Sequence, residues 1–141
     1  MTFKAEPFKL EHLEFFDPAD IGIDVKSTAI FALNYPEIRQ IMTFTKDSKT
    51  IFICGLSFIS EGVWEAWLIP CKDIKKYAKD TVRSMKNFTD WLFDYYSAHR
   101  IQIAVEDFNC KWAKAIGFQF EGIVQKYHKG VDHYMYIKVR N

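Results

Sequence analysis

The sequence predicts a mixed α/β fold in a single domain of residues 1–141. Three observations lead to this prediction: short β-rich segments with tight turns, one long segment of helical periodicity, and a return to strand-like alternation near the C-terminus. A chain of 141 residues has the length of one ordinary domain. Its hydrophobic content of 49% and charged content of 26% exclude a disordered or collagen-like chain.

The N-terminal half begins with short helices and continues with strands. Residues 10–16 predict one or two helical turns that stop at Asp17-Pro18, and residues 24–32 predict a second short helix. Three segments rich in β-formers follow, separated by polar turns. They cover residues 41–45, 51–58 and 63–69. Because the connections between them are short, we expect an antiparallel meander.

A long amphipathic helix is predicted from Lys72 to about Ala98, with an apolar stripe and a basic stripe. The basic stripe consists of Lys72, Lys76, Lys79, Arg83 and Lys86. A strand at residues 101–105 follows the helix. The order strand, long helix, strand predicts a right-handed crossover, so residues 63–69 and 101–105 should pair in parallel.

The C-terminal part predicts a short helix and a hairpin. The helix covers residues 109–116 and ends at Gly117, a suitable C-terminal cap. Two alternating segments, residues 118–127 and 133–139, are joined by a polar turn. The complete prediction is a mixed sheet made from a meander, a long crossover helix, a parallel strand pair, a short helix and a final hairpin.

Charge and cysteine content limit the partners and the compartment. Residues 1–70 hold 6 Lys and Arg against 10 Asp and Glu, whereas residues 71–141 hold 13 against 8, so only the second half is basic. The net charge of +1 argues against a nucleic acid partner. Three widely spaced cysteines predict reduced thiols rather than disulfides or a metal site. No signal peptide or membrane-spanning run is recognisable, so we expect a cytoplasmic protein.

The segment Ala113-Lys114-Ala115-Ile116-Gly117-Phe118-Gln119-Phe120-Glu121-Gly122 resembles the closing "A-x-K-x-G-F-x-x-E-G" segment of the GNAT superfamily of N-acetyltransferases. The hairpin from Tyr127 to Tyr136 and the order of the elements fit as well. The resemblance covers residues 40–141. A single very long helix, an aromatic-rich meander and a weak cofactor loop also resemble a GNAT-like group of phage proteins, some of which serve the assembly of short-tailed virions.

Two functions are compatible with this resemblance. The first is transfer of an acetyl group from acetyl-CoA to the amine of a small molecule or a protein. The second is a catalytically silent phage or prophage protein with a structural or virion-assembly role, which would reside in the host cytoplasm. Further partners compatible with the resemblance are a second copy of the chain, in a homodimer, or a phage structural protein.

The resemblance implies that acetyl-CoA binds between two diverging strands and places its diphosphate at the start of the long helix. The implied cofactor-binding residues are Leu68, Ile69, Cys71, Lys72, Lys75, Lys76, Tyr77 and Asn109. The family's loop "Q/R-x-x-G-x-G/A" has no glycine counterpart here, and Asp73 would repel phosphate. Lysine side chains would have to replace backbone donors. The alternative interpretation of these lysines is a solvated basic face.

Glu65 is the candidate catalytic base, since many family members carry a carboxylate on the equivalent strand. It shares a strand face with Val63, Trp67 and Ile69. The tyrosine that commonly protonates the thiolate is replaced by Ala113, and Tyr127 on the hairpin is the candidate substitute. The alternatives are that Glu65 is an ordinary strand carboxylate and that Tyr127 only packs against its neighbours. No histidine spacing predicts a metal site.

Overall fold

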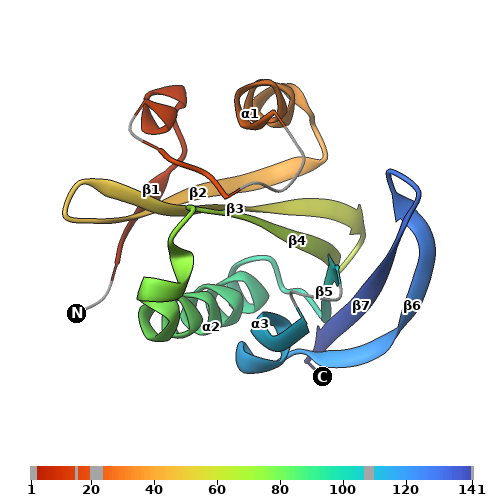
Figure 1. Ribbon diagram of the computed structural model, residues 1–141. Helices are drawn as coiled ribbons and strands as arrows, with labels where there is room; N and C mark the ends of the chain where they lie inside the picture. Colours follow the sequence, from red (N-terminus) through yellow and green to blue (C-terminus); the bar gives the residue numbers. More distant parts are fainter. Residues whose placement is uncertain (1–2, 15, 20–23, 107–109, 141) are drawn as a thin grey trace. The chain divides into compact units, whose positions relative to one another are not determined.

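The structure is a computed structural model that describes residues 3–14, 16–19, 24–106 and 110–140. Its strands are β1 (Lys4–Pro7), β2 (Ile38–Lys46), β3 (Lys49–Ser60), β4 (Val63–Pro70), β5 (Arg100–Val105), β6 (Gln119–His128) and β7 (Val131–Val139). They form one seven-stranded mixed sheet in the order β1-β2-β3-β4-β5-β7-β6 (Figure 1). The predicted fold class is therefore confirmed.

The helices also follow the predicted order, with different bounds. They are the 3₁₀-helices η1 (Leu10–Leu13) and η2 (Ile74–Tyr77) and the α-helices α1 (Val25–Asn34), α2 (Ala78–Tyr95) and α3 (Cys110–Ala115). The predicted helix from Lys72 is wrong at its start, because α-helical geometry begins only at Ala78, after the tighter η2 turn. None of the described helices combines the length and apolar character needed to cross a bilayer.

The strand pairing explains the mixed character of the sheet. The pairs β1–β2, β2–β3, β5–β7 and β6–β7 are antiparallel, and β4–β5 is parallel, as the crossover predicts. The turn between β2 and β3 holds Asp47 and Ser48 at positive φ (51° and 64°), which fits the right-handed twist of a tight hairpin. Strand β1 was not predicted. It is a four-residue edge strand that contains Pro7, so it carries little alternation.

The chain divides into two compact parts, and the first holds the residues up to Ser57 together with Trp67–Thr81. In this part η1 and α1 cover one face of the sheet (Figure 1). Phe8, Ala29 and Ile53 form a buried cluster there, against which Trp67 packs. Aromatic side chains also pack together in this part, where the Phe52 ring stacks on Phe44 and makes an edge contact with Phe3. Helix α1 is capped by Asp24, whose carboxylate accepts a hydrogen bond from the Ser27 N–H.

The second compact part holds Phe58–Ala66 and the residues from Val82 onward. Leu92, Phe93 and Ile101 are almost completely buried in it. The indole of Trp64 in β4 contacts the ring of Tyr96 just after α2. Gly117 ends α3 with φ at 94°, and the N–H groups of Gly117 and Phe118 return to carbonyls of the last helical turn, as the predicted glycine cap requires.

We expect Gly55→Ala to lower the free energy of unfolding by about 2 kcal/mol, the usual cost of overpacking a core. A Cβ on Gly55 in β3 would lie 2.0 Å from the indole carbon Cζ2 of Trp67. Because this separation is far shorter than a van der Waals contact, the indole ring would have to move. Chemical denaturation of the variant and the wild type measures the difference.

The matched control is Gly122→Ala in β6, where a Cβ would meet no described heavy atom within 4 Å. This control should change stability by less than about 0.5 kcal/mol. Combining Gly55→Ala with Trp67→Phe should recover part of the loss. Equal stability of the two alanine variants would contradict the packing interpretation.

Candidate active site

The two predicted catalytic residues lie in direct contact. Glu65 is a half-buried residue of β4, and Tyr127 lies near the end of β6, 62 residues later in the chain. The Tyr127 hydroxyl lies 2.7 Å from Glu65 Oε1 and 2.9 Å from Oε2, so it donates to the carboxylate. The fold therefore brings together a carboxylate and a phenol hydroxyl, a pair that can accept and donate a proton side by side.

Three residues that the sequence analysis did not select complete a hydrogen-bonded network around this pair. Gln102 in β5 donates from Nε2 to Glu65 Oε1 at 2.9 Å. Arg100, two residues earlier on the same strand, donates from Nε to Gln102 Oε1 at 3.1 Å. The remaining guanidinium nitrogens of Arg100 contact both carboxylate oxygens of Glu121 in β6, at 2.6 and 2.7 Å. We call Glu65, Tyr127, Gln102, Arg100 and Glu121 the polar network.

The polar network lies where the parallel pairing of β4 and β5 ends. The register pairs Val63 with Arg100, Trp64 with Ile101 and Glu65 with Gln102. Within the described residues of these strands, no later pair follows. Glu65 and Gln102 are thus both paired in the backbone and joined by their side chains. Side chains two apart on a strand share a face, so the alternation of Arg100 and Gln102 was a usable signal for this network.

Burial and hydrogen bonds shift the pKa values of Tyr127, Glu121 and Arg100 in the polar network. Burial, followed by the hydrogen bond and the charge of Glu65, raises the pKa of Tyr127 to about 12. The hydrogen bond from Arg100 holds the pKa of Glu121 below its usual value, and the same contact raises the pKa of Arg100. At neutral pH the network therefore holds a neutral phenol and an ionised Arg100–Glu121 pair.

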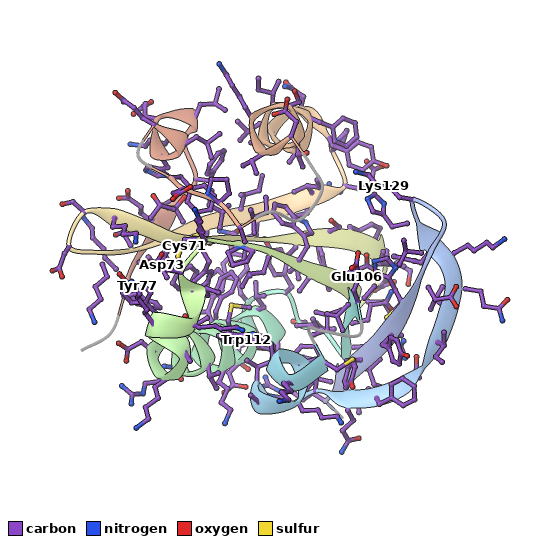
Figure 2. The ribbon with its side chains drawn as sticks, viewed as in Figure 1. Cys71, Asp73, Tyr77, Glu106, Trp112 and Lys129 are labelled. Atoms are coloured by element: carbon purple, nitrogen blue, oxygen red, sulfur yellow. The ribbon has the colours of Figure 1, made fainter. Side chains whose placement is uncertain are left out.

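The predicted cofactor-binding residues at the end of β4 and in the turn before α2 form a second group, in which Figure 2 labels Cys71 and Tyr77 together with the neighbouring Asp73. Ile69 and Cys71 are buried, Leu68 and Tyr77 are half-buried, and the lysines at 72, 75 and 76 are exposed. Asn109, predicted with this group, lies outside the described residues.

The carboxylate of Asp73, which the sequence predicts to repel phosphate, is paired with two ammonium groups. Lys49 Nζ lies 3.0 and 3.1 Å from its two carboxylate oxygens, and Lys76 Nζ lies 3.6 Å away. The hydrogen bond from Lys49 lowers the pKa of Asp73 to about 2, so it is ionised at neutral pH. Burial and the neighbouring Asp73 raise the pKa of the Cys71 thiol, which therefore stays protonated.

Backbone donors at the start of the long helix are largely in use. The N–H groups of Cys71, Lys72, Ile74 and Lys76 donate to carbonyl oxygens of the first compact part at 2.8 to 3.2 Å. A glycine-rich loop would direct such groups at a phosphate. The exposed ammonium groups of Lys72 and Lys75 are further donors that could reach an anion here.

A segment of the same compact part lies along the end of β4. Lys72 N–H donates to the Asp17 carbonyl at 2.8 Å, and Ala19 N–H donates to the Pro70 carbonyl at 2.9 Å, with Pro18 and Cys71 as the bridged pair. Backbone groups alternate between the two edges of a strand, and Cys71 N–H is used by Ile51 of β3. Residues 17–19 therefore lie along the edge that faces away from β3, beginning at Pro70, the last residue of β4.

Leu68 precedes the stretch of β4 that residues 17–19 occupy, and its backbone groups lie on the same edge as those of Pro70. Amide groups of a pantetheine arm would have backbone partners there. Lysine side chains would be needed for the phosphates of acetyl-CoA, since four N–H groups before the long helix already donate to carbonyl oxygens.

No protein-family model and no curated protein matches this chain. Solved structures do match it. An acetyltransferase of the GNAT family from Bacillus anthracis aligns with a TM-score of 0.75 and 14% identity, covering 99% of this chain and 95% of that chain. The ribosomal-protein-S5-alanine acetyltransferase of Vibrio fischeri aligns with a TM-score of 0.72 and 15% identity over 100% and 94%.

A third solved structure is the Microcin C7 self-immunity acetyltransferase MccE in complex with acetyl-CoA and AMP. It aligns with a TM-score of 0.65 and 16% identity, covering 82% of this chain and 68% of that chain. At these identities the likeness establishes the fold alone. The chain has the fold of GNAT acetyltransferases, as the sequence resemblance predicted, and the relationship to phage proteins stays a prediction.

Among the seven tyrosines, we expect Tyr127 to ionise late, near pH 12, in a titration followed by ultraviolet tyrosinate absorbance. Its ordinary pKa is about 10, so the folded protein should lose stability as the pH rises from about 10 to about 12. Glu65→Gln removes the negative charge beside Tyr127 and should bring the pKa of Tyr127 part of the way back toward its ordinary value. Tyr127→Phe should abolish the late component, and Tyr95→Phe should leave it in place.

Proposed function

We propose that this protein is an N-acetyltransferase that moves an acetyl group from acetyl-CoA to an amine of a small molecule or a protein. The single observation that carries the proposal is the contact between Glu65 and Tyr127 at the last β4–β5 pair, in a chain with the GNAT fold. A carboxylate that accepts two hydrogen bonds from neutral groups has the chemistry of a general base.

Glu65 would take a proton from the acceptor. An aliphatic amine is mostly protonated at neutral pH, and its lone pair becomes available only after that proton leaves. Bound acetyl-CoA would supply the activated acetyl thioester. The proton taken by Glu65 stays on a carboxylate oxygen beside Tyr127 Oη.

Proton uptake by Glu65 would change what Tyr127 does. A protonated Glu65 can donate to Tyr127 Oη, and the Tyr127 O–H is then free to donate to a developing anion. The charge that contributes to the raised pKa of Tyr127 disappears in the same event. Because even an ordinary phenol, with a pKa of about 10, does not give its proton completely to the thiolate of a thiol with a pKa of about 8.5, Tyr127 would act mainly by hydrogen-bond donation.

The cofactor would be held by the edge of β4 and by lysines. Leu68 would offer its backbone groups, and Ile69, Cys71 and Tyr77 would shape that part of the site. The exposed ammonium groups of Lys72, Lys75 and Lys76 would bind the phosphates by charge-assisted hydrogen bonds. The structure supports this assignment through the exposure of the lysines and through the pairing of Asp73 with Lys49.

We expect Glu65→Gln to lower the turnover of amine acetylation by one to three orders of magnitude, within the range of about 10²–10⁴ that a general base contributes. Release of free CoA thiol from acetyl-CoA, in the presence of polyamines, amino acids and peptides with a free N-terminus, measures the rate. The matched control is Glu61→Gln, at an exposed position in the β3–β4 turn, which should keep full turnover. Unchanged turnover in Glu65→Gln would remove Glu65 from its role.

We expect the double variant Lys72→Glu/Lys75→Glu to weaken acetyl-CoA binding about ten-fold or more, because two side-chain contacts to phosphate become repulsive. Calorimetric titration with acetyl-CoA measures the affinity, and added salt should weaken the wild type more than the variant. Lys86→Glu, at an exposed position of α2, is the control with one reversed charge. Wild-type affinity in the double variant would show that the lysines do not hold the cofactor.

A further inference from the structure

Gln102 has its amide orientation imposed from both sides. The Nε–H of Arg100 can only donate, so the Gln102 atom 3.1 Å from it must be the oxygen Oε1. The other end of the amide is then the nitrogen Nε2, which can only donate, and it lies 2.9 Å from Glu65 Oε1. Chemistry therefore fixes the direction of this amide, and Gln102 presents a donor to Glu65.

Arg100 is itself held in place by Glu121. Two guanidinium nitrogens contact the two Glu121 oxygens in a bidentate pair, and the third nitrogen remains for Gln102. The Arg100 side chain is 26% exposed, so solvent does not compete freely for these contacts. A planar guanidinium can serve both partners at once, which a lysine ammonium at this position would not reproduce.

The neutrality of Gln102 has a chemical consequence. Gln102 lies between the Arg100 guanidinium and Glu65, so Arg100 orients Glu65 through the Gln102 amide without contacting it. A cation bonded directly to Glu65 would stabilise the carboxylate and make it a weaker base. Within the polar network, the partners of Glu65 are the uncharged Tyr127 and Gln102, so the carboxylate is oriented without being neutralised.

We infer that Gln102 is a positioning residue of the active site, a neutral spacer that takes its orientation from the Arg100–Glu121 pair and holds Glu65 as an effective base. This inference rests on the proposed acetyltransferase function. It assigns no contact with substrate or cofactor to Gln102. It predicts that the charge of the side chain at position 102 sets the pH range in which the enzyme works.

The test compares two substitutions at the same position. Gln102→Met removes the donor, so kcat should fall about ten-fold and the acidic limb of the pH–rate profile should move to higher pH. Gln102→Lys places a cation beside Glu65, so the acidic limb should move to lower pH, again with reduced kcat. KM for acetyl-CoA should stay within about two-fold in both variants. Gln125→Met, at an exposed glutamine of β6 outside the polar network, is the control and should keep the wild-type profile.

A merely structural role for Gln102 would lower activity without moving the limb, or would move it in the same direction in both variants, and either result would overturn the inference. Among the described residues, the ionisable groups linked to Glu65 through the polar network are Arg100, Glu121 and Tyr127, and the ring of His133 lies 5.6 Å from the Tyr127 ring. Glu65→Gln identifies the limb that belongs to Glu65, because that limb must be absent from its profile.

A nuclear magnetic resonance titration separates this inference from the proposed function. The side-chain amide resonance of Gln102 in nitrogen-labelled protein should follow the titration of Glu65 and should lose that response in Glu65→Gln. A response in a protein that acetylates no amine would refute the acetyltransferase proposal and keep the hydrogen-bonded arrangement. An absent response in an active enzyme would refute the positioning role and leave the acetyltransferase intact.

Discussion

The parallel pairing of β4 and β5 ends at Glu65 and Gln102, and this end point organises the candidate site. Before it, backbone hydrogen bonds hold the two strands in register. At it, the side chains of the same two residues join each other and extend to Arg100, Glu121 and Tyr127. A polar network of this kind requires a fixed register, because a slip of one residue would turn every side chain to the other face.

The polar network connects β6 to β4 and β5 at two separate points. Glu121 lies near the beginning of β6 and Tyr127 lies near its end, and both side chains reach residues of the parallel pair. β6 is an edge strand whose residues are mostly exposed, so it has little apolar burial to hold it. Charge-assisted hydrogen bonds from Arg100 and the bond from Tyr127 therefore contribute to the order of the hairpin as well as to the chemistry of the site.

The start of the long helix differs from a glycine-rich phosphate-binding loop in the use of its backbone groups. Local backbone hydrogen bonds take the N–H groups that a glycine-rich loop would expose, and residues 17–19 occupy part of the strand edge beside them. Asp73, which sequence inspection treats as an obstacle, is paired with Lys49 of β3 and Lys76. An ammonium on a flexible stem places charge less precisely than a backbone N–H, so a lysine-based site trades geometric selectivity for long-range attraction.

The sequence alone determined the order of the elements and the fold class, because apolar periodicity and turn residues act over a few neighbouring positions. It predicted the parallel β4–β5 pair, the glycine cap after α3, and Glu65 and Tyr127 as candidates. It missed β1, whose pairing is set by β2, and the 3₁₀ turn before α2. Only the tertiary structure brought Tyr127 to Glu65, placed Gln102 and Arg100 beside them, and paired Lys49 with Asp73. The contacts of Glu65 with Tyr127 and Gln102, and that of Lys49 with Asp73, join residues 62, 37 and 24 positions apart, so no local pattern encodes them.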